Sequence, residues 1–185
     1  MITVSMCVDG EKKIFGKEFD MKTEREILRE AMSQEAEKQG FACTAFLPVK
    51  DLVFVPEYRK YCEQNLCGNY DKLKMCPPKS GTVEEMKERA CQYETAFIMQ
   101  TIQQLDVCNP DEIKRAKHRH NEMTRGVEEI LKKAGVPFLT MSAGPTATSS
   151  CMSAYCVDAA KMADACGMEY WRKDGRCAFF SEILF

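Results

Sequence analysis

The sequence predicts an α/β fold: a single domain spanning residues 1–185, with a layered sheet flanked by helices and a cysteine-rich loop at about 56–80. Segments with strand patterns alternate along the chain with amphipathic helical segments, which is typical of layered α/β architectures. A length of 185 residues with 45% hydrophobic side chains suffices for one sizeable core but would leave two independent domains cramped.

The N-terminal third predicts two short strands followed by a helix. Residues 1–8 and 14–19 flank a glycine turn and are interpreted as strands. Thr23 and Glu26 have the spacing of a capping box, and Gly40 is a suitable helix stop, so the helix is predicted between them.

The middle of the chain predicts strands on both sides of a capped helix. Residues 43–55 are rich in Val, Phe and Leu and predict one bent strand or two short ones. Thr82 and Glu85 form a second capping box, for a helix that runs to about Gln92. Residues 95–102 then predict a buried strand.

The C-terminal part begins with a long helix. Asn109 precedes its first turn and Gly135 follows its last, as N-terminal and C-terminal caps do. The remaining predicted elements are strands at 136–141, 170–171 and 177–185 and a helix at 153–165.

Two groups of cysteines are the candidate functional residues. The first has the spacing Cys62-x4-Cys67-x8-Cys76, in a stretch that glycine and proline are predicted to keep out of regular structure, so its thiols can converge on one point. The second, Cys151 and Cys156, follows the predicted strand 136–141. If the strands are parallel, both loops gather at the carboxyl end of the sheet.

Thiolates are soft ligands that suit iron–sulfur clusters or zinc. Zinc modules usually carry cysteines two to four residues apart, and none of these gaps is Cys-x2-Cys, which favours iron. A cysteine followed by proline, as at Cys76, is also a habit of ferredoxin loops, although the ferredoxin Cys-x2-Cys-x2-Cys run is absent. The competing interpretation is that these cysteines are merely buried small side chains.

Composition narrows the class of protein. A formal net charge of −2 argues against a primary nucleic-acid binder. No apolar run reaches the roughly 18 residues of a membrane span, and no secretion signal is apparent, so a cytoplasmic location is predicted. In that reducing compartment clustered cysteines indicate metal binding or catalysis before disulfides.

Several other residues are predicted to be structural. His118 and His120 are interpreted as surface residues of the long helix. Cys43, Cys91 and Cys166 are interpreted as core residues, and Cys108 as an exposed thiol.

The run from Tyr61-Cys62 to Cys67-Gly68-Asn69-Tyr70, then Met75-Cys76-Pro77-Pro78 and the helix start at Thr82, resembles the predicted metal-binding proteins called domain of unknown function 2284. The resemblance is specific over residues 54–102 and weaker over the rest of the chain. It implies a metal or iron–sulfur protein with Cys62, Cys67 and Cys76 as ligands, and it implies no reaction.

The chain departs from this family after Ala143-Gly144-Pro145. The family typically has several closely spaced cysteines there and a later Cys-Arg-His-Pro element. This chain has Thr146 and Ser149 in that neighbourhood and lacks the later element. A second full metal site is therefore not expected.

The sequence thus predicts a metal-binding protein with one [4Fe-4S] cluster for electron transfer or redox chemistry, held by Cys62, Cys67 and Cys76 with Cys151 or Cys156 as the fourth ligand. The partner would be a redox protein or a small-molecule substrate. Whether the protein is an enzyme stays open: three cysteine ligands would leave one iron free for substrate, with Asp71, Lys72 or Lys74 nearby. The alternatives are a structural Zn2+ module for protein interaction and a disulfide-based redox sensor. Oligomeric state is not predicted.

Overall fold

The computed structural model describes the backbone of residues 11–170 and 174–185, and side chains from residue 23 onward within those ranges. A five-stranded sheet is built in the order β1-β2-β5-β3-β4. The strands are β1 (Cys43–Pro48), β2 (Thr95–Gln104), β3 (Leu139–Ser142), β4 (Ser150–Cys151) and β5 (Arg176–Leu184). The α-helices are α1 (Glu11–Gln39), α2 (Arg59–Glu63), α3 (Val83–Ala90), α4 (Pro110–Ala134) and α5 (Ala159–Ala165).

The predicted α/β layer architecture is confirmed, but the sheet is mostly antiparallel. β2 pairs antiparallel with β1 and with β5, and β5 pairs antiparallel with β3. Only β3 and β4 pair in parallel among the described strands. The expectation that both cysteine loops gather at one carboxyl end therefore has the wrong geometry, because β1 and β3 run in opposite directions.

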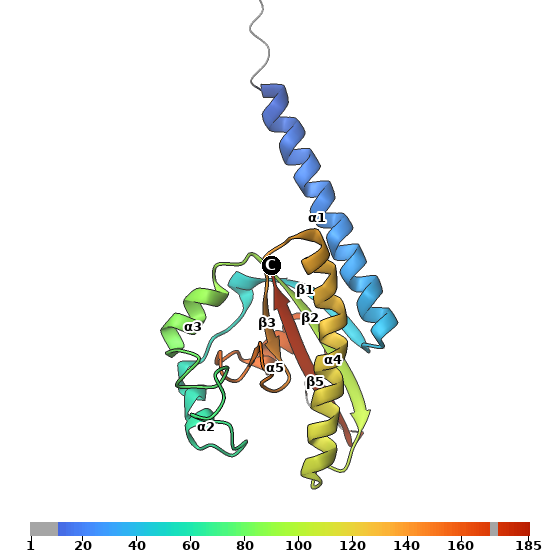
Figure 1. The fold of residues 1–185 in the computed structure, drawn as a ribbon. Helices are drawn as coiled ribbons and strands as arrows, with labels where there is room; N and C mark the ends of the chain where they lie inside the picture. The colour runs from blue at the N-terminus through green and yellow to red at the C-terminus, as the bar shows by residue number, and fades with distance from the viewer. Residues whose placement is uncertain (1–10, 171–173) are drawn as a thin grey trace, which may run out of the picture.

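Helices and loops cover both faces of the sheet. In Figure 1, α1 and α4 lie together over one face, while α3, α5 and the loops around α2 lie on the other side. Both faces of the sheet must be covered because β2 carries apolar side chains on both. Phe97 and Met99 point to one side and Ala96 and Ile98 to the other, and all four are fully buried. We call the two sides the helix face and the cysteine face.

The helix face has an apolar core and a buried polar network. Met32 of α1 and Val127 and Leu131 of α4 pack against Phe97 and Met99. His120 is fully buried at this interface, so its predicted surface position is wrong. The helical periodicity of the sequence alone cannot show that the His120 ring hydrogen-bonds to two strands that are distant in sequence.

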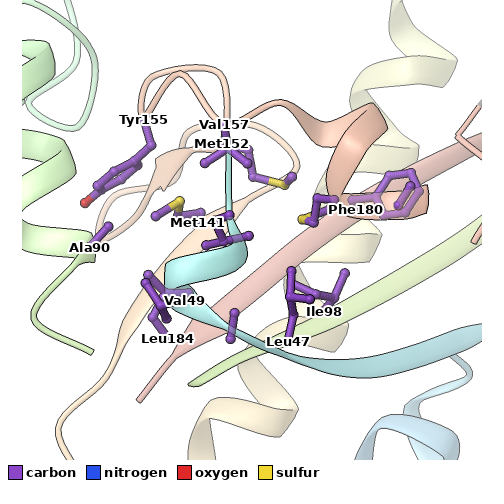
Figure 2. Packing of buried hydrophobic residues seen from close by; sticks show 14 of the residues in the cluster. Leu47, Val49, Ala90, Ile98, Met141, Met152, Tyr155, Val157, Phe180 and Leu184 are labelled. Carbon is purple, nitrogen blue, oxygen red and sulfur yellow. The ribbon is translucent and has the colours of Figure 1, made fainter. Parts of the chain in front are cut away.

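The core of the cysteine face is larger and joins the second cysteine loop to the sheet. Figure 2 shows Met152, Tyr155 and Val157 of that loop packed over Met141 and Ile98 of the strands. α3 and α5 close this core from the sides with Met86, Ala90, Met162 and Ala163.

The helix caps predicted from local signals are confirmed for α3 and α4. Thr82 and Glu85 make both bonds of the capping box. Asn109 accepts hydrogen bonds from two backbone amides at the start of α4, and Gly135 ends it in a left-handed conformation with φ +67°. The closing strand β5 and the buried strand β2 also lie where they were predicted.

The N-terminal predictions are wrong where they can be compared. Residues 14–19, predicted as a strand, belong to α1, and Thr23 lies inside that helix rather than capping it. α1 as a whole contains many Lys and Glu residues, which favour helix over strand. The helix does end before Gly40 as predicted, whereas the strand predicted at 1–8 lies outside the described residues.

The boundaries of several other helices and strands differ from the predicted ones. The helix predicted at 153–165 begins only at Ala159, because Asp158 caps it there. The strand predicted from 43 ends at Pro48, the helix predicted to Gln92 ends at Ala90, and the strand predicted at 136–141 is β3. Tyr170 lies in a bend rather than a strand, and residue 171 lies outside the described residues.

The remaining predictions about single residues are mixed. Cys43 and Cys91 are exposed, so their predicted core positions are wrong, whereas Cys108 is exposed as predicted. Among the described residues, no helix has the length and apolar character needed to cross a membrane.

Candidate metal centre

The first cysteine loop begins as short helical turns rather than as an irregular coil. A 3-10 helix at Pro56–Tyr58 leads directly into α2, which carries Cys62. The prediction that this stretch avoids regular helix is therefore wrong for Cys62. The prediction holds for Cys67, which lies in a turn, and for Cys76, which lies in a bend.

Backbone hydrogen bonds join this loop to the second cysteine loop. Phe54 and Val157 form an antiparallel bridge. On either side of it, the Val55 amide donates to the Cys156 carbonyl and the Asp158 amide donates to the Val53 carbonyl, each at 2.8 Å. This short ladder brings together two segments about a hundred residues apart in sequence.

One thiol from each loop contacts the other loop at this junction. Cys62 Sγ lies 3.9 Å from the Ser153 carbonyl oxygen of the second loop. Cys156 Sγ lies 3.9 Å from the Pro56 carbonyl oxygen of the first loop. Cys76 and Cys156 are buried, Cys62 and Cys151 are half-buried, and Cys67 is exposed.

Electrostatic interactions link several of the candidate thiols. Burial, followed by the charge of Cys151 and smaller effects of Cys156 and Cys67, raises the pKa of Cys62 to about 11 against the opposing charge of Arg59. Burial, followed by the charges of Cys151 and Cys67, raises the pKa of Cys76 to about 11. A bound cation would remove this cost, because a coordinated thiol is deprotonated.

Cys151 is more central to this group than Cys156. Cys151 raises the pKa of both Cys62 and Cys76, and its own pKa is raised by burial and by Cys67. Cys156 raises the pKa of Cys62 alone among these thiols. Its backbone has φ +59°, a left-handed conformation that is strained for a residue other than glycine.

Arg59 is a site residue that the sequence analysis missed. Its guanidinium donates to the Ala154 carbonyl at 3.1 Å, which ties α2 to the second loop. Burial raises the pKa of Cys156, and the charge and hydrogen bond of Arg59 oppose that shift. Its position one helical turn before Cys62 is the signal that could have identified it.

Lys117 adds a second positive charge from α4. Burial raises the pKa of Cys151, and Lys117 opposes this effect. The Lys117 side chain passes beside Gly144, in the loop that leads to Cys151. The cysteine thiols are therefore flanked by two cations, Arg59 of α2 and Lys117 of α4.

The loop after β3 is the one in which the family resemblance predicts further cysteines in related proteins. In this chain it carries serine and threonine hydroxyls instead. Ser142 Oγ donates to the Gly144 carbonyl at 2.6 Å, and Thr146 and Ser149 hydroxyls lie 2.7 Å apart. Ser149 Oγ also donates to Ser142 Oγ at 3.2 Å. The hydroxyls of this loop thus bond to one another and to the backbone.

The loop charges considered as acid or base groups lie on the surface. Asp71 forms an ion pair with Lys79 at 3.5 Å. Lys72 and Lys74 are exposed. Within the described part of the chain, no three Cys, His, Asp or Glu side chains are placed to hold a single metal ion.

These features define a class: a mixed α/β protein in which two joined loops bring thiols together beside two half-buried cations. The chain belongs to the family described as predicted metal-binding protein, domain of unknown function 2284, whose model matches residues 45–146. That range includes Cys62, Cys67 and Cys76 and ends before Cys151. No significant match was found among curated proteins or among solved structures.

Proposed function

We propose that this protein holds one [4Fe-4S] cluster with Cys62, Cys67, Cys76 and Cys151 and serves in electron transfer or redox chemistry. The observation that carries the proposal is the junction of the two cysteine loops, where backbone hydrogen bonds at 2.8 Å join them and the charges of Cys151 and Cys67 raise the pKa of Cys62 and Cys76. A cluster bound there would supply one-electron transfer.

The spacing of the thiols favours a cluster over a single zinc ion. With Zn–S bonds of about 2.3 Å, four tetrahedral thiolates lie only about 3.8 Å from one another. A four-iron cluster holds its cysteines farther apart, because each cysteine binds a different iron. The gaps Cys62-x4-Cys67 and Cys67-x8-Cys76 include no Cys-x2-Cys pair of the kind that zinc modules use.

The neighbouring cations support an anionic metal group. Four thiolates bring more negative charge than a [4Fe-4S] core neutralises, so the site needs positive charge nearby. Arg59 lies beside Cys62 and Cys156, and Lys117 lies beside Cys151. Cys156, held by the Pro56 carbonyl and Arg59, would then be a neighbour of the cluster rather than a ligand.

Metal analysis of anaerobically purified protein tests this proposal. We expect a brown protein with about four iron and four sulfide per chain. Cys67→Ala and Cys151→Ala should each lose most of the iron and sulfide, whereas Cys108→Ala, at an exposed thiol outside both loops, should keep wild-type content. Cys156→Ala should retain the cluster, with altered visible absorption or reduction potential.

Two outcomes would contradict the proposal. A colourless protein with one zinc and no sulfide would instead support the structural zinc module. Full iron and sulfide content in Cys151→Ala together with loss in Cys156→Ala would keep the cluster but exchange the fourth ligand.

A further inference from the structure

The first cysteine loop exposes large apolar side chains next to its thiols. Leu66 is 86% exposed, Tyr61 is 52% exposed and Leu73 is 40% exposed. Of the five large hydrophobic side chains exposed in the described residues, these three belong to this one loop. Leu66 directly precedes Cys67, which is itself exposed. The apolar surface therefore lies at the part of the proposed site nearest to solvent.

Local hydrogen bonds hold these side chains outward. Asn65 adopts a left-handed conformation with φ 53°, which turns the chain just before Leu66. The Asn65 side chain accepts from the Tyr70 amide at 3.0 Å, and its carbonyl accepts from the Gly68 amide at 2.9 Å. The exposure of Leu66 is thus built into a closed turn.

Positive side chains border the same apolar surface. Lys60, Lys72 and Lys74 are exposed, and none has an acidic partner among the described side chains. Lys60 instead lies over the ring of Tyr61, at 5.4 Å. Residues 56–80 carry five Lys and Arg side chains against three acidic ones, Glu57, Glu63 and Asp71, whereas the whole chain has a formal net charge of −2.

The N-terminal half of α4 carries further positive side chains. Lys114, Arg115 and Arg119 are exposed there, again without an ion pair among the described residues. Figure 1 shows this end of α4 and the α2 loop at the same end of the molecule. Lys117, from the same stretch, reaches the electrostatic surroundings of Cys151.

We propose that this surface, formed by Tyr61, Leu66 and Leu73 with the rim Lys60, Lys72 and Lys74, docks an acidic protein that carries single electrons. The inference rests on the proposed cluster: one electron passes between the cluster and the partner's redox centre, and no covalent bond forms or breaks. An apolar centre with a charged rim is the usual anatomy of a protein interface, and small interfaces suit transient electron-transfer complexes.

A protein partner fits this surface better than a nucleic acid does. Charge complementarity with an acidic partner would steer association, which opposite charges accelerate by about 10- to 1,000-fold. A nucleic-acid site needs a more extensive basic face than a chain of pI about 5.8 usually carries. Burying Leu66, which is 86% exposed, against an apolar protein surface also gives a larger favourable free energy than contact with phosphates does.

Binding and electron transfer with two small redox proteins test the inference. The probes are an acidic plant-type ferredoxin and a basic cytochrome c, measured by interferometry and stopped-flow absorbance at several salt concentrations. The wild type should associate faster with the acidic probe, and salt should slow that association. Lys72→Glu with Lys74→Glu should lower its association rate by about tenfold at low salt.

Matched variants separate docking from general charge and folding effects. Lys50→Glu with Lys133→Glu makes the same charge change at exposed sites outside the loop and α4's N-terminal half, and should change the rate much less. Leu66→Ser should weaken binding of the acidic probe, whereas Ile27→Ser, at another exposed apolar residue, should not. All variants should retain wild-type iron and sulfide.

Equal rates for both probes, or equal effects of the two lysine pairs, would overturn the inference. So would a loop variant that loses binding only to a labelled single-stranded oligonucleotide. If the wild type contains no iron or sulfide, the proposed cluster fails, and interferometry with the acidic probe still reports on docking separately.

Discussion

The two faces of the sheet differ in how completely their buried polar groups are satisfied. On the helix face, His120 Nδ1 lies 2.8 Å from the Thr101 hydroxyl and its Nε2 lies 3.0 Å from the Ser181 hydroxyl. Thr124 closes the network, with its hydroxyl 2.8 Å from that of Ser181 and bonded to the His120 carbonyl. Each member of this network has a partner, as buried polar groups in native structures normally do.

The cysteine face contains the exceptions. Within the described residues, the buried side-chain atoms without a hydrogen-bond partner are Arg59 Nε, Ser150 Oγ and both carboxylate oxygens of Glu182. In the part of the chain that the structure describes, the residues other than glycine in the left-handed region are Asn65, Asp71 and Cys156, all in the two cysteine loops. Unsatisfied groups and strained backbone concentrate at functional sites, so this asymmetry supports the cysteine face as the functional side.

Removing core packing from the helix face should give the largest loss of stability. Phe97 is fully buried and its ring stacks on that of Phe46, at 4.5 Å between centroids. Phe97→Ala should lower the free energy of unfolding by about 3–5 kcal/mol. Urea denaturation measures this loss. Iron and sulfide per folded molecule should stay at wild-type levels; their loss would show that the two faces are not independent.

The two faces should also respond to pH in opposite directions. Burial lowers the pKa of His120 in the folded state to about 4. As the pH drops from about 6.5 to 4, this histidine is therefore protonated in the unfolded state before it is protonated in the folded state, and the free energy of unfolding falls. Burial raises the pKa of Glu182 to about 8, so the folded state keeps its proton and stability falls as the pH rises from about 4.5 to 8. Each slope is at most about 1.4 kcal/mol per pH unit.

Because the two slopes cancel between about pH 4.5 and 6.5, the wild type should lose stability mainly from pH 6.5 to 8. Glu182→Gln should abolish that alkaline loss and leave only the acid loss. His120→Gln should instead extend the alkaline loss down to about pH 4.5. Denaturation midpoints measured across this range check both variants. An unchanged alkaline slope in Glu182→Gln would contradict the assignment.

The local helix signals could be predicted from sequence because each depends on neighbouring residues, and the spacing of the cysteines was enough to single them out as candidate ligands. Asn109 and Gly135 cap α4 through their own side chain or backbone conformation. His120 and Arg59 could not be placed in the same way. The partners of His120 come from β2 and β5, and Arg59 meets Ala154 only after two loops have joined. Direction of pairing was also beyond local patterns, since buried strands are equally apolar in parallel and antiparallel sheets.

The smallest predicted effect compares two capping signals with the same spacing. Thr82 on the cysteine face accepts from the Glu85 amide at 3.1 Å, whereas Thr23, three residues before Glu26, lies inside α1. Thr82→Ala should lower the free energy of unfolding by about 1 kcal/mol, because it removes an N-terminal cap. Thr23→Ala should change it by no more than about 0.5 kcal/mol, because alanine is a good residue for a helix interior. Urea titrations of both variants measure the difference. Equal losses would contradict the prediction that the two threonines differ.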